Sequence, residues 1–488
     1  MVDILHRVGI KASLDEVYQA LATREGVAGW WTTNTQGQSK IGGLLKFRFS
    51  SDGKEIGGFD IKVLELQPGK RVIWQVVEGP AEWIGTKIGF DLKQEGDYSI
   101  VLFNHQGWNE PVEFMHHCST KWAIFLMSLK SLVETGKGNP SPTSGSATGT
   151  EERLMRLVRL RAPGGLENLK LVEEDHPKPK PGELLVRMRA SSLNFHDDLV
   201  VLGKIPCADG RTPMSDGAGE VIAVGDGVDD FKVADSVVST FWPYWLGGEM
   251  TPATKRDIPG DSVDGYAREY VCMPAHAFTK APAGYTHVEA ATLTCAGVTA
   301  WRGLVVCGQV EPGDTVLILG TGGVSLFALQ FAKAAGARVI ATSSSEEKLE
   351  KLKRLGADAV INYKAVPDWG QKAKDLTDGR GVDHVIEVGG PGTLTQSITA
   401  CRTGGHIALI GVLTGFAGEV SIPALFSNQI RISGISIGSR ADQEDMIRAI
   451  TANRLKPVID RRFLLQEIVL AFQYYESQKH FGKVCLEL

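Results

Sequence analysis

DTVLILGTGGVSLFALQFAKAAGARVIATSSS, residues 314–345, has the order of an apolar strand, a glycine turn, an amphipathic helix and a second apolar strand. Gly320 allows a sharp turn out of the first strand, and Gly322 and Gly323 let the backbone come close to a pyrophosphate. The following helix points free N–H groups at those phosphates. Ser325 replaces the usual third glycine and is small enough for close packing. This context favours a dinucleotide-binding turn over a glycine-rich turn of an unrelated α/β domain.

The end of the second strand indicates which dinucleotide is bound. Enzymes that use NAD usually place Asp or Glu there to hold the ribose hydroxyls. This chain instead has Ser343, Ser344 and Ser345, with Lys348 one turn into the next helix. Hydroxyls and an ammonium suit a 2′-phosphate, so we expect NADP(H) as the cofactor. The serines also fit a helix N-cap, and the two interpretations are compatible.

Composition limits the class of protein. The chain has 488 residues, of which 43% are hydrophobic, and a net charge of −5, so we expect two or three domains and no binding to nucleic acid. The first residues lack the apolar core of a signal peptide, and no apolar run is long enough to span a bilayer. Seven dispersed cysteines without a CxxC pair are typical of reduced thiols, so we expect a cytoplasmic protein without membrane contact.

The segment 1–138 alternates apolar and polar residues in five runs separated by turn signals, and it ends in a long amphipathic helix over about 111–134. A capping box at Ser13–Glu16 predicts a short helix near its start. With ASLDEVYQALATREGVAGWW, WQVVE and FNHQGW, this segment resembles START-like helix-grip proteins, in the branch of the activator of the Hsp90 ATPase. The resemblance implies an apolar cavity, which would suit an apolar ligand. The segment could also bind a protein partner or only support folding.

Polar and aromatic residues of this segment allow two interpretations each. His105, His116 and His117 could orient a ligand, but exposed or hydrogen-bonded histidines fit the composition better. Trp30 and Trp31 could line the cavity, although core packing is the simpler interpretation. We find no reactive constellation here. Residues 139–153, rich in Gly, Ser, Thr and Pro, read as a flexible linker, of natural or engineered origin.

The rest of the chain predicts a β-rich module followed by alternating strands and helices. We assign 154–275 and 441–488 to the β-rich module and 276–440 to a doubly wound parallel sheet. SSLNFHDDLVVLGKIP, SDGAGEVIAVGDGVDDFKVADSV, AATLTCAGVTAWRGL, VIEVGG and HFGKV resemble the medium-chain dehydrogenase/reductase superfamily, in the zinc-independent branch similar to quinone oxidoreductases. The resemblance covers about 155–488 and implies a GroES-like domain joined to a Rossmann domain. The fold class is therefore α/β and α+β, with several domains.

The resemblance also bears on a metal site. Zinc-dependent members place a Cys, a Gly-His-Glu and a second Cys around the metal. This chain has Asn194 in the first place, Met214–Gly217 without a histidine in the second, and Cys295 in the third. A catalytic zinc needs three protein ligands, so we expect no metal, and Cys295 reads as a small buried apolar residue.

The resemblance places the nicotinamide in the cleft between the two modules, near Asn194 and Thr299. Tyr363 and Lys483 are candidate phosphate contacts, although Tyr363 could equally be a packing residue. The residues expected to bind the cofactor are Gly320, Thr321, Gly322, Gly323, Val324, Ser343, Ser344, Lys348, Tyr363, Val388, Gly389, Gly411, Ile437, Gly438, Lys483 and Thr299.

His196 and Asn194 are the candidate catalytic residues. His196 stands where zinc-dependent relatives carry a proton-relay hydroxyl, and an imidazole there could protonate a reduced carbonyl near neutral pH. It could also be a loop histidine that hydrogen-bonds Asp197 or Asp198. Enoyl-thioester reductases of the superfamily have a Tyr before the following proline, where this chain has Ile205, which weighs against that activity.

Three functions remain open at this point. The first is an NADPH-dependent reductase of quinones or conjugated carbonyls, which need no strong acid because a reduced quinone is a stabilised phenolate. The second is a reductase of a biosynthetic intermediate that the helix-grip domain delivers. The third is a non-catalytic regulatory protein that binds NADPH. A homodimer is also expected, because the superfamily often dimerises through its nucleotide fold.

Overall fold

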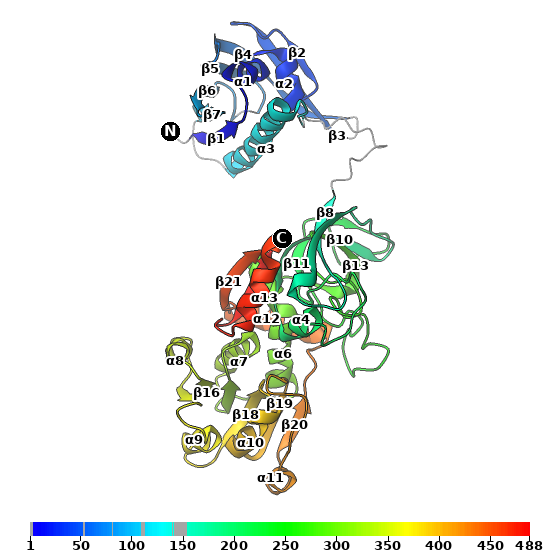
Figure 1. Cartoon of the computed structure of the whole chain (residues 1–488), viewed down its shortest axis with the longest axis vertical. Coiled ribbons are helices and arrows are strands. Elements are labelled where there is room, and N and C mark those ends of the chain that lie inside the picture. The colour runs from blue at the N-terminus through cyan, green and yellow to red at the C-terminus, as the bar shows by residue number, and fades with distance from the viewer. Residues whose placement is uncertain (1–2, 52–53, 81, 109–112, 139, 141–153) are drawn as a thin grey trace. The chain divides into compact units, whose positions relative to one another are not determined.

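The computed structural model describes residues 3–51, 54–80, 82–108, 113–138, 140 and 154–488. The chain divides into two compact units between residues 151 and 152 (Figure 1). The predicted linker 139–153 lies outside the described residues, apart from residue 140. Within the described part, no helix is long and apolar enough to cross a membrane.

The first unit is a seven-stranded antiparallel sheet with three helices. Its strand order, β1-β7-β6-β5-β4-β3-β2, confirms the predicted meander, because each strand from β2 onward pairs with the next one in sequence. The Ser13 capping box starts the first helix as predicted, with the Ser13 N–H donating to Glu16 Oε2. The elements are β1 Ile4–Ile10, α1 Leu14–Ala22, α2 Arg24–Trp30, β2 Thr35–Gly37, β3 Leu44–Ser51, β4 Lys54–Gln67, β5 Arg71–Glu78, β6 Lys87–Glu95, β7 Tyr98–Gln106 and α3 Glu113–Thr135.

Aromatic rings fill the interior between this sheet and α3. Trp31 stacks on Trp30 and Trp74, with ring centroids 5.5 and 5.8 Å apart. Trp122 of α3 packs against Trp31 at 4.7 Å. Trp30 and Trp31 are therefore core residues, in agreement with the simpler interpretation.

His105 is a satisfied core histidine. Burial lowers its pKa to about 3, so the ring is neutral. Its Nε2 lies 2.8 Å from the Thr86 hydroxyl, and its Nδ1 accepts from Trp122 Nε1 at 3.3 Å. Both ring nitrogens have partners, which leaves no free atom for catalysis. The side chains of His116 and His117 lie outside the described residues.

The β-rich module of the second unit is a sheet in the order β14-β12-β11-β10-β22-β21, with β13 also paired to β10. The predicted return of the tail is confirmed, because β22 pairs antiparallel with β10. Figure 1 shows the red C-terminal elements beside the green strands of this module. The strands are β8 Met155–Leu160, β9 Leu169–Glu174, β10 Glu183–Ser192, β11 Ala218–Val224, β12 Ser236–Ser239, β13 Tyr270–Pro274, β14 Phe278–Lys280, β21 Ile459–Leu464 and β22 Lys483–Glu487.

The nucleotide-binding module is a parallel sheet in the order β17-β16-β15-β18-β19-β20, which is the doubly wound order. Successive strands are added on one side of β15 as far as β17 and then on its other side from β18 onward. In such sheets the ligand binds at the carboxyl ends of the two strands where this order changes, here β15 and β18. The final strand, β20, was not predicted. The strands are β15 Thr315–Leu319, β16 Arg338–Ser343, β17 Ala359–Asn362, β18 Val382–Glu387, β19 Cys401–Leu409 and β20 Arg431–Gly434.

Helices connect and cover the two modules. One helical segment, residues 287–306, carries π turns on both sides of α6, and such turns are frequent at functional sites. The helices of this unit are α4 Phe195–Val201, α5 His287–Ala291, α6 Val298–Trp301, α7 Gly323–Ala334, α8 Glu346–Arg354, α9 Trp369–Asp375, α10 Pro391–Ala400, α11 Ile422–Ser427, α12 Arg440–Asn453 and α13 Ile468–Glu476.

Candidate active site

The glycine turn lies at the carboxyl end of β15, at the start of α7. Gly320 has a left-handed backbone, with φ of 72°, and its N–H donates to Thr342 O of β16 at 3.0 Å. A Cβ placed on Gly320 or on Gly322 would meet no protein atom within 4 Å. Ser325 is buried and its hydroxyl donates to Leu319 O at 2.7 Å, so it joins helix to strand at short range. The turn is therefore open on one side, as a phosphate-binding turn must be.

Gly323 packs against the terminal strand. A Cβ there would stand 2.5 Å from Lys483 Cδ and 3.0 Å from Ala296 Cβ. The missing side chain therefore makes room for Lys483, and the predicted approach to a pyrophosphate stays a prediction. The neighbouring Gly482 N–H donates to Thr321 O at 2.8 Å. The terminal strand β22 therefore begins directly against the glycine turn.

Lys483 makes its polar contacts within the protein, and its predicted contact with a phosphate stays a prediction. Its side chain is 4% exposed and runs into the β-rich module. There Nζ donates to Leu193 O at 2.7 Å and to Asn194 Oδ1 at 2.5 Å, and lies 3.5 Å from Asp216 Oδ2. An ammonium out of water needs such acceptors, and the phosphate side of the turn offers none within the protein.

Asn194 lies at the N-terminus of α4, where its backbone N–H donates to Asp197 Oδ2 at 2.9 Å. The carboxylate thus caps the helix, and the Asn194 amide is free to accept from Lys483. Burial raises the pKa of Asp216 to about 6 against the opposing pull of Lys483. Asp216 Oδ1, Ser215 Oγ and Thr299 Oγ1 are buried polar atoms without a hydrogen-bond partner within the described protein. Such atoms mark a site for polar ligand groups.

His196 lies between two carboxylates. Its Nε2 is 3.3 Å from Asp261 Oδ2 and its Nδ1 is 3.9 Å from Asp197 Oδ1. Burial would lower the pKa of His196, but the two carboxylates raise it to about 9. The ring is therefore an imidazolium near neutral pH, with its edge toward Phe241. The loop interpretation predicted a hydrogen bond to Asp197 or Asp198. Within the described protein His196 Nδ1 has no hydrogen-bond partner, and Asp197 is an ion-pair neighbour only, whereas Nε2 hydrogen-bonds Asp261 of a distant loop.

The far end of the turn holds the serines. Ser343 is buried and its hydroxyl accepts from the Ser345 N–H at 3.2 Å, while Ser345 caps α8. Ser344 follows it and is half-buried. Tyr363 is 39% exposed, and its N–H bonds Ser343 O, so its ring stands near the serines rather than in the core.

Lys348 does not lie over the serines. Its Nζ donates to Gln478 O at 2.9 Å and to His480 O at 2.8 Å, in the segment before β22. Burial lowers its pKa. The predicted contact with a 2′-phosphate would require this ammonium to leave two carbonyls, and it stays a prediction.

The nicotinamide side of the predicted site is built from backbone. Glu387 is buried and accepts from the N–H groups of Gly389 and Gly390, which fixes the turn that begins at Val388. A Cβ on Gly411 would stand 1.7 Å from Val388 O, so the two segments touch. Ile437 has a φ of 63°, a strained value for a β-branched residue, and Gly438 follows it.

The segment 241–265, which the sequence left undecoded, contacts this side. Trp242 Nε1 donates to Ser436 O at 3.1 Å, and Ile437 packs against Phe241, Trp242 and Cys295. Asp261 of the same segment reaches His196. The segment therefore joins His196 to the residues around Ile437.

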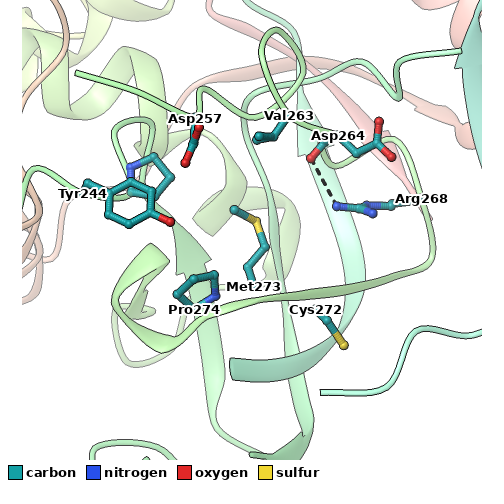
Figure 2. Close-up of a pocket in the computed structure, with 9 residues that line it drawn as sticks. Tyr244, Asp257, Val263, Asp264, Arg268, Cys272, Met273 and Pro274 are labelled. Carbon is teal, nitrogen blue, oxygen red and sulfur yellow. Dashed lines mark hydrogen bonds between the residues drawn. The ribbon is translucent and has the colours of Figure 1, made fainter. Parts of the chain in front are cut away.

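A pocket of about 200 Å³ is lined by Tyr244, Asp257, Val263 and Asp264 of this segment and by Arg268 and Met273, among others (Figure 2). Arg268 donates to Asp264 O at 3.1 Å, and the Asp264 carboxylate pairs with Arg159. The pocket contains none of the predicted site residues. Its ion pairs instead anchor the segment that carries Asp261.

The donor set does not fit a catalytic zinc. The three places occupied by ligands in zinc-dependent relatives hold an amide at Asn194, a hydroxyl at Ser215 and a thiol at Cys295. Burial holds the pKa of Cys295 well above its usual range, so the thiol is neutral. The Lys483 ammonium already pairs with Asp216 there. Among the described residues, no three His, Cys, Asp or Glu side chains gather where they could hold a metal ion.

Sequence reasoning missed three functional contacts. Asp197 carried a usable signal, because Asn194 and Asp197 have the spacing of a helix N-cap and its third residue. Asp261 and the Lys483–Asn194 bond carried none, because their partners are 65 and 289 residues away in the chain.

Comparison with known proteins agrees with this architecture. Residues 180–283 match the family described as alcohol dehydrogenase GroES-like domain, and residues 323–452 match zinc-binding dehydrogenase. Residues 11–134 match activator of Hsp90 ATPase homolog 1-like protein.

Individual relatives cover the second unit. A zinc-type alcohol dehydrogenase-like protein of Schizosaccharomyces pombe is 44% identical over 336 residues, which are 66% of this chain and 96% of that protein. A solved NAD-dependent alcohol dehydrogenase is 34% identical, with a TM-score of 0.63 over 68% of this chain and 100% of its own. A mycobacterial structure complexed with NADPH is 28% identical, with a TM-score of 0.58 and the same coverage. The chain therefore belongs to the medium-chain dehydrogenase/reductase superfamily, as an alcohol dehydrogenase-like oxidoreductase joined to a domain like the activator of the Hsp90 ATPase.

Proposed function

We propose that the chain is an NADPH-dependent, zinc-independent oxidoreductase that transfers hydride to a quinone or a conjugated carbonyl. The observation that carries this proposal is the open backbone at Gly320 and Gly322, where a Cβ would meet no protein atom within 4 Å. A turn with space for a pyrophosphate, next to buried polar atoms without protein partners, is what a dinucleotide reductase needs.

The choice of NADPH is supported by Ser343 at the end of β16, where a carboxylate would repel a 2′-phosphate. The neighbour with bound NADPH is consistent with this choice, and the NAD-dependent neighbour offers the alternative that a test must exclude. We propose a zinc-independent reaction because Asn194, Ser215 and Cys295, at the places of the zinc ligands, do not form a ligand set for zinc.

The cofactor, when bound, supplies a hydride from its nicotinamide ring. The chain's own residues would orient the nicotinamide and the substrate and would protonate the reduced substrate. The backbone around Val388 and Ile437 holds the nicotinamide side, and the Thr299 hydroxyl has a free donor for a carboxamide or a substrate oxygen. The His196 imidazolium is the candidate acid, and it could release a proton to a reduced oxygen near neutral pH. A quinone needs this acid least, because its reduced form is a stabilised phenolate.

The test mixes the full-length protein with NADPH or NADH and a panel of quinones, enals and simple ketones, and follows the loss of the reduced nicotinamide absorbance. We expect turnover of quinones or enals with NADPH preferred, and no change after dialysis against a chelator. Turnover of ketones alone, or a loss with the chelator, would contradict the proposal. NADPH binding without any turnover would instead favour a regulatory protein.

We also propose that the first domain is an accessory binding domain, for an apolar ligand or for a protein partner. A truncated chain of residues 152–488 should keep its turnover of small quinones. If the truncated chain loses turnover of one larger substrate and keeps that of small quinones, the alternative is favoured, a reductase of an intermediate that this domain delivers. Loss of all turnover would show that the first domain belongs to the active site.

The nucleotide module is proposed to form a homodimer. Leu413, Phe416, Ile422 and Phe426, all more than half exposed, lie around α11 near the edge strand β20. Light scattering should give twice the chain mass, and Phe416→Ser with Phe426→Ser should give monomers; a monomeric wild type would refute this. The seven unpaired cysteines are consistent with a cytoplasmic setting.

A further inference from the structure

The place at which zinc-dependent relatives hold their metal is not filled by apolar residues in this chain. It contains a positive charge, the ammonium of Lys483, from the C-terminal end of the sequence. Lys483 is the first residue of β22, and Gly482 before it bonds to the glycine turn through Thr321 O. The lysine stem then passes Gly323, whose missing Cβ leaves the room that it needs.

The lysine head group has its acceptors arranged around it. An ammonium has three N–H donors and no acceptor. Nζ has three oxygen neighbours, at 2.7 Å on Leu193, 2.5 Å on Asn194 and 3.5 Å on Asp216. Asp216 is fully buried and holds a further bond from the Ser192 hydroxyl at 2.5 Å. A buried charge persists only when it is paired in this way.

The same contacts settle the orientation of the Asn194 amide. Because a lysine can only donate, the oxygen of the amide must face Nζ, and its NH₂ group must face the other side. That NH₂ lies 3.2 Å from Asp197 Oδ2. Lys483 thereby fixes which atoms Asn194 presents in the cleft.

We propose that the Lys483 ammonium is a built-in substitute for the metal cation of zinc-type relatives, which supplies the positive charge of the cleft, positions Asn194 and excludes a metal. The inference concerns the resident cation alone. Its test measures metal uptake and stability, so it can fail while the proposed reductase activity stands, and the reverse is also possible.

The first experiment rebuilds a metal site with and without the lysine. Asn194→Cys with Ser215→His restores ligands next to Cys295, and a second variant adds Lys483→Met. Cobalt(II) is the probe, because a tetrahedral thiolate site gives it an intense visible spectrum. We expect one equivalent of cobalt in the triple variant, and at least tenfold weaker uptake in the double variant and in the wild type.

Equal cobalt uptake by the double and triple variants would overturn the proposal, because the lysine would then not occupy the metal's place. So would a triple variant that is folded by circular dichroism and takes up no cobalt. Stoichiometric binding by the wild type, lost in Cys295→Ala, would overturn it as well.

A second measurement needs only one or two substitutions. Lys483→Met leaves Asp216 unpaired, so the melting temperature should fall, and adding Asp216→Asn should recover at least half of that fall. Lys348→Met is the matched control, because its ammonium bonds two carbonyls and no carboxylate. Asp216→Asn should give Lys348→Met no recovery. Absence of recovery with Lys483→Met, or equal recovery in both backgrounds, would refute the charge pairing.

Discussion

Substituting Gly322 tests the dinucleotide site with the least disturbance of the fold. The residue has φ of −78° and ψ of 178°, which any amino acid can adopt, and a Cβ there meets no protein atom within 4 Å. It is also the N-cap of α7, where Asp stabilises a helix more than Gly does, by a few tenths of a kcal/mol. Gly322→Asp should therefore leave the melting temperature unchanged or slightly raised.

Cofactor binding should respond in the opposite way. The new carboxylate would face a pyrophosphate, and two like charges at about 4 Å repel by about 4 kcal/mol at an effective dielectric constant of about 20. That energy corresponds to roughly a thousandfold weaker binding. Gly322→Asn is the matched control, because it has the same size without the charge, so the difference between Asp and Asn isolates the electrostatic part.

The assay is a titration of each purified variant with NADPH, followed by fluorescence or calorimetry, beside a thermal melt of the free protein. Affinities for the Asp and Asn variants within a factor of three of each other would show that no phosphate lies near Gly322. A large loss of stability in Gly322→Asp would show that the space at this residue is not open.

Three more substitutions follow from the site. Burial lowers the pKa of His196, but its carboxylate partners raise it to about 9, so its ion pairs stabilise the fold fully below about pH 6.5 and this contribution disappears as the pH rises through about 9. The melting temperature of the wild type should therefore exceed that of His196→Gln at about pH 6 and approach it at about pH 10. A difference in melting temperature that does not change with pH would contradict the pairing. Ser343→Asp should lower the NADPH-to-NADH affinity ratio at least tenfold by the same charge argument, and an unchanged ratio would place cofactor choice elsewhere. Gly323→Ala should cost about 1–3 kcal/mol of unfolding free energy in a denaturant titration, because its methyl group would overlap the Lys483 side chain, and a neutral effect would show that the stem can move aside.

The sequence predicted those parts of the molecule that are encoded locally. The turn between β15 and α7 was found because strand, glycines and helix are consecutive, and the capping box at Ser13 because its two members are three residues apart. The meander of the first unit was predicted from alternation within each strand. The strand β20 was missed, because its four residues are too short to show a period.

Contacts between distant segments could not be predicted in the same way. The place of Lys348 after the serines predicted a phosphate contact, and the family resemblance predicted one for Lys483. A sequence shows that a residue is charged, but not which group that charge contacts. The structure shows that the Lys483 ammonium pairs inside the β-rich module and that Lys348 bonds the backbone before β22. Which oxygen a long side chain reaches depends on the packing of the whole domain, and no local pattern contains that information.

The two sides of the glycine turn therefore have separate physical roles. Gly322 faces open space, whereas Gly323 faces Lys483 and through it Asn194 and Asp216. The backbone bond from Gly482 to Thr321 and the Lys483 contacts come from two consecutive residues at the start of β22, so the same short segment holds the glycine turn and the polar groups around Lys483. A change on the open side should alter cofactor affinity without altering stability. A change on the lysine side must alter both, because it moves the segment that joins them.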